Sequence, residues 1–315
     1  MTRLDFNFGN AVSHYSKTGG PSGFLWKFAL VFALVTLVIQ AVGIWLQWPL
    51  YELYLRMFTE GGGDIEAYAD EINRMSMTIG LRGLWIMPLG ILTWVVFEGA
   101  NQRRYMRGEG FSLRIGADEG RLFIVGLIWF ALFIGLYIGM IIVMIVPVLI
   151  GAALGSAGAA IGAILMLLAL FGYLIAMLWV AARLSAASAL TVRDREIRFF
   201  ESWKVTKNKG WTIVGAWIVI LLILMVIYMV LYAIAAAVGF AIVNAQVPGL
   251  MDGTPDEAAL TAALASPGLW GPLLVIFFIA FLVQAASQHI LSGPGALAAR
   301  TDDDWAGADV AGEFQ

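Results

Sequence analysis

Long apolar stretches alternate with short polar segments along this chain. Each apolar stretch contains at least about 18 mostly hydrophobic residues, which at ~1.5 Å per helical residue is enough to cross a hydrocarbon core of ~30 Å. The pattern therefore predicts helices that cross a membrane several times. The predicted spans are residues 24–47, 79–99, 122–149, 157–182, 211–243 and 269–291.

Composition strengthens this interpretation. Hydrophobic residues make up 61% of the 315 residues, charged residues make up 13%, and the mean hydropathy is +0.85. A soluble domain of this length cannot bury so much apolar surface in one core. The predicted fold class is therefore an all-α, polytopic integral membrane protein with six transmembrane helices and interfacial amphipathic helices. The chain has no cysteine, which excludes disulfides and metal sites built on thiolates.

Three regions follow from the positions of the spans. In the N-terminal segment, Leu4, Phe8, Ala11 and Tyr15 repeat at helical spacing, and His14 is interpreted as an ordinary polar residue of this helix. The first apolar stretch is too long for the core of a cleavable signal peptide, so we expect a retained anchor. The regions are a cytoplasmic amphipathic segment at 1–23, a six-helix transmembrane domain at 24–292 and an acidic cytoplasmic tail at 293–315.

The distribution of Lys and Arg predicts the orientation. Of the 17 Lys and Arg residues outside the predicted spans, 15 lie on the side of the N-terminus, and only Arg56 and Arg74 lie on the other. The positive-inside rule places both termini in the cytoplasm. The outer segments 48–78 and 244–268 are acidic. We expect a multi-pass membrane protein.

The most charged segment, RDREIRFFESWKVTKNKGW at 193–211, joins the fourth and fifth spans on the cytoplasmic side. On a helical wheel its aromatic residues share one side, with basic residues beside them. One interpretation is a helix lying in the membrane interface, where basic side chains reach anionic headgroups. The other is a cytoplasmic continuation of the fifth span. The candidate membrane-interface residues are Arg195, Arg198, Phe199, Phe200, Trp203, Lys204 and Lys207.

Two charged residues end their spans at the same cytoplasmic depth. Glu98 closes the second span and Arg183 closes the fourth. We predict a structural ion pair between them, and the alternative is that each occupies a separate interfacial position.

Glycines recur four residues apart, as in Gly135 with Gly139, Gly151 with Gly155, and Gly158 with Gly162. Such pairs allow close approach of helix backbones in lipid. We expect them to pack within one bundle, with self-association through a glycine face as the alternative.

Two sequence stretches resemble a known family. FSLRIGADEGRLFIVGL at 111–127 and ARLSAASALTVRDREIRFFESWKVTKNKGW at 182–211 are similar to bacterial six-span inner-membrane proteins related to the membrane domain of glycerophosphodiester phosphodiesterases and to YciC-like proteins. The resemblance implies the six-span fold and a multi-pass protein of the bacterial inner (cytoplasmic) membrane. It does not imply the phosphodiesterase reaction, because the soluble catalytic domain with its His, Glu and Asp residues has no counterpart in this chain.

The titratable residues give no catalytic constellation. Ser156 and His289 are excluded as a dyad because they fall at opposite ends of their predicted spans. No series of carboxylates runs through the spans, which argues against a proton-coupled pump. Asp302, Asp303 and Asp304 are a weak ligand set because they are consecutive and lack a glycine-turned loop. We therefore predict no metal site, no cofactor and no nucleic-acid partner.

Two functions from different classes remain. The favoured one is a non-enzymatic structural or accessory protein that contacts anionic lipids, other membrane proteins or its own copies through basic cytoplasmic loops. The alternative is a transporter or channel for a small or lipid-like molecule, suggested by Gln40, Asn244 and Gln284 in or beside the spans. A polar cavity reaching the middle of the bilayer would favour transport.

Overall fold

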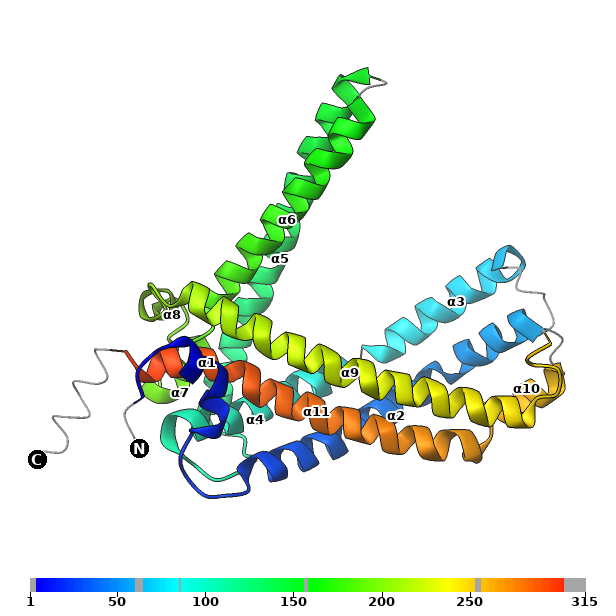
Figure 1. Ribbon diagram of the computed structural model, residues 1–315, viewed down its shortest axis with the longest axis horizontal. Coiled ribbons are helices and arrows are strands. Elements are labelled where there is room, and N and C mark those ends of the chain that lie inside the picture. The colour runs from blue at the N-terminus through cyan, green and yellow to red at the C-terminus, as the bar shows by residue number, and fades with distance from the viewer. Residues whose placement is uncertain (1–3, 60–64, 85, 156–157, 253–255, 303–315) are drawn as a thin grey trace, which may run out of the picture. The chain divides into compact units, whose positions relative to one another are not determined.

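The computed structural model describes residues 4–59, 65–84, 86–155, 158–252 and 256–302, and every regular element in these ranges is helical (Figure 1). The elements are α1 (Phe8–Ser13), the 3₁₀ turn η1 (His14–Ser16), α2 (Phe24–Thr59), α3 (Ile65–Gly83), α4 (Ile86–Arg107), α5 (Ala117–Ala153), α6 (Gly158–Leu184), α7 (Ala187–Asp194), α8 (Glu201–Val205), α9 (Gly210–Gln246), α10 (Glu257–Leu264) and α11 (Pro267–Arg300).

The predicted fold class is confirmed: the protein is an all-α, polytopic integral membrane protein. Over the described residues, five helical regions are long and apolar enough to span a membrane, and a sixth is present if α3 and α4 form one bent span. The five regions are Phe24–Tyr54, Ala117–Ala153, Gly158–Asp194, Gly210–Gln246 and Ala258–Arg300.

The predicted second span is divided between α3 and α4, whose axes meet at 42°. The apolar part of α4 runs only from Ile86 to about Phe97 before polar residues begin. At ~1.5 Å per residue this part is ~18 Å long, too short to cross a ~30 Å core alone. A full crossing therefore needs the C-terminal turns of α3 as well.

The segments expected to be outer loops are largely helical. Helix α2 continues to Thr59, α3 begins at Ile65, and α10 lies between α9 and α11. Apolar periodicity gives the membrane-crossing core of a helix but not its ends, because polar residues extend a helix beyond the bilayer at little cost. The Asp256 side chain caps α10 by accepting a hydrogen bond from the Ala259 amide at 3.0 Å.

Contacts divide the chain into two units. The second unit comprises Gly23–Trp94 and Leu222–Gln288. In it α2 and α3 lie side by side (Figure 1). Together with Ile86 of α4 they line a partly open cavity of about 300 Å³ whose lining is mainly apolar, with the side chains of Gln47 and Ser76 as polar exceptions.

The first unit comprises Met1–Ser22, Val95–Leu221 and His289–Gln315. Its longest feature is the hairpin of α5 and α6 (Figure 1). A Cβ atom on Gly158 would lie 1.9 Å from the Gly151 carbonyl oxygen, and one on Gly162 would lie 3.1 Å from the Gly151 Cα. These glycines therefore permit close packing of the two backbones within one chain. Gly135 faces open space and takes no part in this contact.

Alanine-rich packing joins the other helices of the first unit. Ala182, Ala186, Ala189, Ala296 and Ala299 belong to one buried cluster with Tyr105 and Leu190. Small side chains allow close helix approach, and at Gly295 an added Cβ would lie 2.4 Å from the Ser185 carbonyl oxygen.

The N-terminal segment is built into this unit and does not form the long amphipathic helix that its spacing suggested. Helix α1 has only six residues, capped by Asn7, and η1 follows it directly. Ala11 and His14 are completely buried. The C-terminal region also differs from expectation, since α11 continues to Arg300. Most of the predicted tail, from residue 303 onward, lies outside the described residues.

Candidate membrane-interface site

The charged segment 193–209 is not a continuous helix, so both interpretations of it as one helix are wrong. Helix α7 ends at Asp194, and Arg195 adopts the left-handed conformation with φ 58°. This geometry stops a helix, because continuing it requires a right-handed residue. Asn208, with φ 63°, separates α8 from α9 in the same way. The segment is therefore a short helix, α8, between two tight bends.

Phe199 anchors this segment inside the first unit. Its side chain is 2% exposed and packs with Val125, Leu184 and Ala187. The Trp129 ring meets it edge to face, with centroids 5.5 Å apart. Phe199 is therefore a core residue and does not reach the membrane surface.

Phe200 and Trp203 point the other way. Phe200 is 71% exposed and Trp203 is 39% exposed. The Arg183 guanidinium lies 4.6 Å from the centroid of the Trp203 ring, and the Trp179 ring meets Trp203 edge to face at 5.1 Å. Arg183 also donates to the Trp203 carbonyl oxygen and, at 3.1 Å, to Thr206 Oγ1. Trp203 is thus exposed and held in a fixed orientation.

The basic residues of the segment divide into two groups. Arg198 lies among three carboxylates, those of Glu196 at 2.9 Å, Glu201 at 3.6 Å and Asp194 at 3.8 Å, so its charge is largely compensated within the protein. Arg195, Lys204 and Lys207 are exposed. Within the described ranges, no salt bridge involves Arg195 or Lys207.

The predicted ion pair between Glu98 and Arg183 does not form. Arg183 is occupied by Thr206, Trp203 and Trp179, as described above. Glu98 is buried and accepts a hydrogen bond from Gln102 Nε2 at 2.8 Å. An equal depth along two helices does not bring side chains together, because the rotation of each helix also decides which neighbour they meet.

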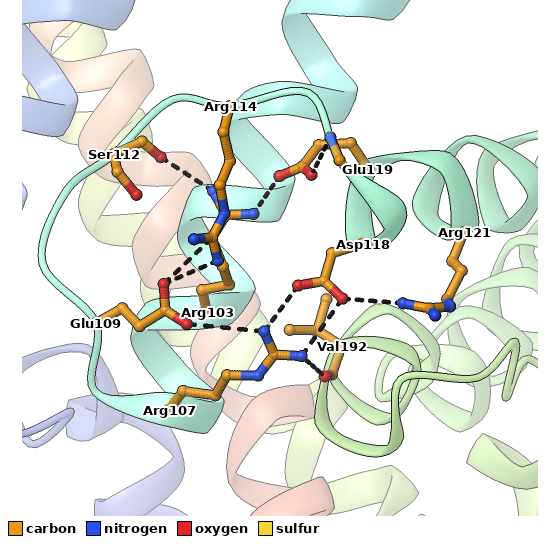
Figure 2. Close-up of polar contacts among 10 residues, drawn as sticks. Arg103, Arg107, Glu109, Ser112, Arg114, Asp118, Glu119, Arg121 and Val192 are labelled. Carbon is orange, nitrogen blue, oxygen red and sulfur yellow. Dashed lines mark hydrogen bonds and ion pairs between the residues drawn. The ribbon is translucent and has the colours of Figure 1, made fainter.

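A buried ion network lies beside this segment (Figure 2). It joins the C-terminal end of α4, the loop that follows, the first turn of α5 and the C-terminal end of α7. Arg103 and Glu119 form its centre, with side chains only 1% and 2% exposed. Glu119 also accepts a hydrogen bond from the Gly116 amide at 2.9 Å.

The rest of the network surrounds this centre (Figure 2). Arg107 binds Asp118 at 2.7 Å and donates to the Val192 carbonyl oxygen, which ties α4 to α5 and α7. Arg121 binds Asp118 at 3.2 Å. The Glu109 carboxylate forms a salt bridge with the Arg114 guanidinium at 3.0 Å and lies 3.6 Å from Arg103 Nε. Several residues counted as basic loop charges in the sequence are therefore already paired within the protein.

Two further contacts fix the ends of helices near α8. Arg193 donates to the Ala299 carbonyl oxygen at 2.7 Å and pairs with Asp302 at 3.4 Å. Lys209 donates to the carbonyl oxygens of Ala298 and Thr301 at 3.3 and 3.1 Å, where a cation complements the C-terminal end of α11. Asp302, one of the three carboxylates judged too weak a set to bind a metal, serves as an ion-pair partner. Asp303 and Asp304 lie outside the described residues.

Sequence reasoning missed the network, although its signal was present. Arg103 and Arg107 are four residues apart on one helix face, and Asp118 and Glu119 follow a glycine that begins the next helix. Arginines at the end of one helix and carboxylates at the start of the next can form charge-assisted hydrogen bonds across the loop that joins them. Over the described part of the chain, no group of three or more His, Asp or Glu residues is placed to hold a metal ion.

Comparison with known proteins adds no family assignment: no family model, curated protein or solved structure matches the chain.

Proposed function

We propose that this chain is a non-enzymatic accessory protein of the bacterial inner membrane, with both termini cytoplasmic, that contacts anionic lipid headgroups through α8 and its flanking bends. The observation that carries the proposal is the exposed pair Phe200 and Trp203 with the exposed cations Arg195, Lys204 and Lys207 on the same short segment. The resemblance to six-span inner-membrane proteins is in keeping with this role.

The chemistry of these groups suits the headgroup region. Tryptophan favours the interface because its ring is apolar while its N–H can form a hydrogen bond, and phenylalanine adds apolar surface that can insert at the headgroup boundary. Each Lys or Arg near an anionic surface contributes ~1 kcal/mol. Arg195 and Lys207 form no salt bridge within the described residues, so their full charge can attract lipid phosphates. Arg198 cannot do this, because three carboxylates surround it.

Rigidity adds to the contact. Phe199 fixes one side of the segment in the core, and Arg183 holds Trp203 from behind. A surface that is already ordered loses less conformational entropy when lipid binds than a flexible loop does. The five exposed residues are therefore expected to act as one preformed headgroup-binding surface.

The cavity between α2 and α3 favours a second candidate function, the handling of a lipid-like molecule. Its volume of about 300 Å³ and mainly apolar lining fit part of an acyl chain better than a hydrated ion, although Gln47 and Ser76 supply polar groups. A fluorescent fatty acid displaced on substitution of Gly43 or Gly80 by Leu, both of which line the cavity, would support this alternative.

The headgroup contact is tested by measuring depth in the bilayer. The chain lacks native cysteine, so a single Cys can carry a nitroxide in the full-length protein reconstituted into nanodiscs. A label at position 200 should be accessible to oxygen and protected from a water-soluble nickel complex. A label at position 196, where the exposed Glu196 lies on the same segment, is the matched control and should show the reverse.

A charge change then separates lipid contact from simple burial. Lys204→Glu with Lys207→Glu should raise the nickel accessibility of position 200 in discs with anionic lipid. In discs of neutral lipid the two proteins should differ little, because the attraction being removed is electrostatic. Equal nickel accessibility at positions 196 and 200 in anionic discs would overturn the proposal.

A further inference from the structure

The N-terminal segment forms a strap across the first unit, here defined as residues 4–18. Phe6 packs against the alanine-rich cluster, and Ala11 packs with Ala216 of α9 and Leu297 of α11. At the far end, Thr18 Oγ1 accepts a hydrogen bond from Arg104 Nε at 2.9 Å. The strap is therefore docked along its length against α4, α9 and α11.

His14 is the buried centre of the strap. Its ring stacks on Tyr105 with centroids 5.2 Å apart, and Tyr105 in turn stacks on His289 at 4.7 Å. The side chain is completely buried. Neither ring nitrogen has a hydrogen-bond partner among the residues that the structure describes.

His289, in contrast, has a polar contact at each ring nitrogen. Its Nδ1 lies 2.5 Å from Asn101 Oδ1, and its Nε2 lies 3.3 Å from the Tyr15 carbonyl oxygen. Asn101 is itself held by a hydrogen bond to Ser292 at 2.9 Å. His14 has the ring stacking but none of these polar contacts, so nothing around it is arranged to stabilise an added proton.

The surrounding charges also oppose protonation of His14. The titratable and charged groups of the packed elements are Tyr15 and Lys17 of the strap, Glu98, Arg104 and Tyr105 of α4, Lys209 before α9, and His289 and Arg300 of α11. The carboxylate in this set, Glu98, accepts a hydrogen bond from Gln102. Burial, followed by the charges of Arg300, His289 and Lys17, lowers the pKa of His14 from 6.5 to about 3.

We propose that the strap is a latch released by protons: uptake of a proton by His14 undocks residues 4–18 from α4, α9 and α11. In the docked state the imidazole is neutral and stacked. In the released state it is hydrated and can carry a positive charge, because the opposing cations and the apolar contacts are then removed.

The direction and size of the pH effect follow from linkage. The undocked histidine binds a proton with the ordinary pKa of 6.5, whereas the docked one resists it. The stabilisation of the docked strap is therefore complete well above pH 6.5 and is lost progressively as the pH falls toward the docked pKa. Between pH 8 and pH 5 the opening equilibrium should rise about 30-fold.

Hydrogen exchange on the full-length protein in nanodiscs measures this equilibrium directly. After correction for intrinsic exchange, amide protection in residues 8–18 should fall about 30-fold from pH 8 to pH 5, while residues 187–205 serve as an internal reference. His14→Phe keeps a stacking ring without a titratable group, so its strap should show the same protection at both pH values. Gly293→Leu is a positive control for disruption of this packing, because a Cβ at Gly293 would lie 3.2 Å from the Tyr105 hydroxyl, 3.5 Å from the Tyr15 amide nitrogen and 3.6 Å from the His14 Cβ, so a larger side chain must displace Tyr105 or the strap.

A measurement on the unsubstituted chain tests the proposal even if His14→Phe fails to fold. Carbon NMR of labelled histidine should show the His14 ring neutral at pH 5 in the fraction whose strap remains protected. Titration of His14 near pH 6.5 with no loss of protection would overturn the proposal. So would an unchanged pH dependence in His14→Phe, since the responding group would then be His289 or another residue.

Discussion

Replacing Glu119 by Gln tests whether the buried ion network holds the helix ends of the first unit together. The two carboxylate oxygens of Glu119 have different donors, the Arg103 guanidinium and the Gly116 amide. An amide side chain offers only one oxygen. Whichever way it turns, its NH₂ group faces a donor, and Arg103 keeps a buried charge without its main partner.

The expected loss of stability is large for a change of one atom. Removing one member of a buried ion pair costs ~3–5 kcal/mol, because the remaining charge is desolvated and uncompensated. Arg103 retains the Ser112 carbonyl oxygen at 3.0 Å and the half-buried Glu109 at 3.6 Å. These remaining contacts place the expected loss at the lower end, about 3 kcal/mol.

Unfolding in mixed micelles of a mild detergent and SDS, followed by tryptophan fluorescence, measures this loss. The control is Glu71→Gln, since Glu71 pairs with Arg56 at 3.8 Å and both side chains are exposed. That exposed pair should contribute less than ~1 kcal/mol.

A double substitution separates charge pairing from packing. Arg103→Met combined with Glu119→Leu removes both charges and should recover most of the stability lost in Glu119→Gln, because no unpaired charge stays buried. If Glu119→Gln costs no more than Glu71→Gln, or if the double variant is the less stable of the two, the ion pair does not have the role inferred from its burial.

Three further predictions concern packing and topology. Gly158→Leu should separate α5 from α6 and lower the unfolding midpoint in the same micelle assay, whereas Gly135→Leu should be tolerated because its Cβ faces open space. Phe199→Ala should destabilise by ~3–5 kcal/mol, as expected for a buried aromatic residue; a loss below ~1 kcal/mol would contradict its assignment to the core. In intact spheroplasts a membrane-impermeant thiol reagent should label Cys in place of Asp256 but not in place of Lys207, and the opposite pattern would exclude the proposed orientation.

The segment around α8 illustrates how far sequence reasoning reached. It identified the aromatic and basic residues that make the segment unusual, and two of the three aromatic side chains, Phe200 and Trp203, are exposed as a membrane contact requires. It misjudged the backbone, because Arg195 adopts a left-handed conformation. Arginine rarely does so, and the sequence therefore showed no sign of the bend. It also grouped Phe199 with Phe200 and Trp203 on one face. A helical wheel assumes a continuous helix, and the bend at Arg195 interrupts that helix.

The sequence by itself determined that the chain is helical and crosses a membrane, because uninterrupted apolar stretches leave the backbone no other way to satisfy its hydrogen bonds in lipid. Only the tertiary structure decided which charges face each other and that both histidines are buried. Arg103 meets Glu119 and not a lipid phosphate, and His14 lies under Tyr105 and not on an exposed face. The transfer of an apolar side chain into lipid depends on that side chain alone and can be summed along the sequence. Which side chains pair or become buried depends on how helices distant in the chain rotate and cross.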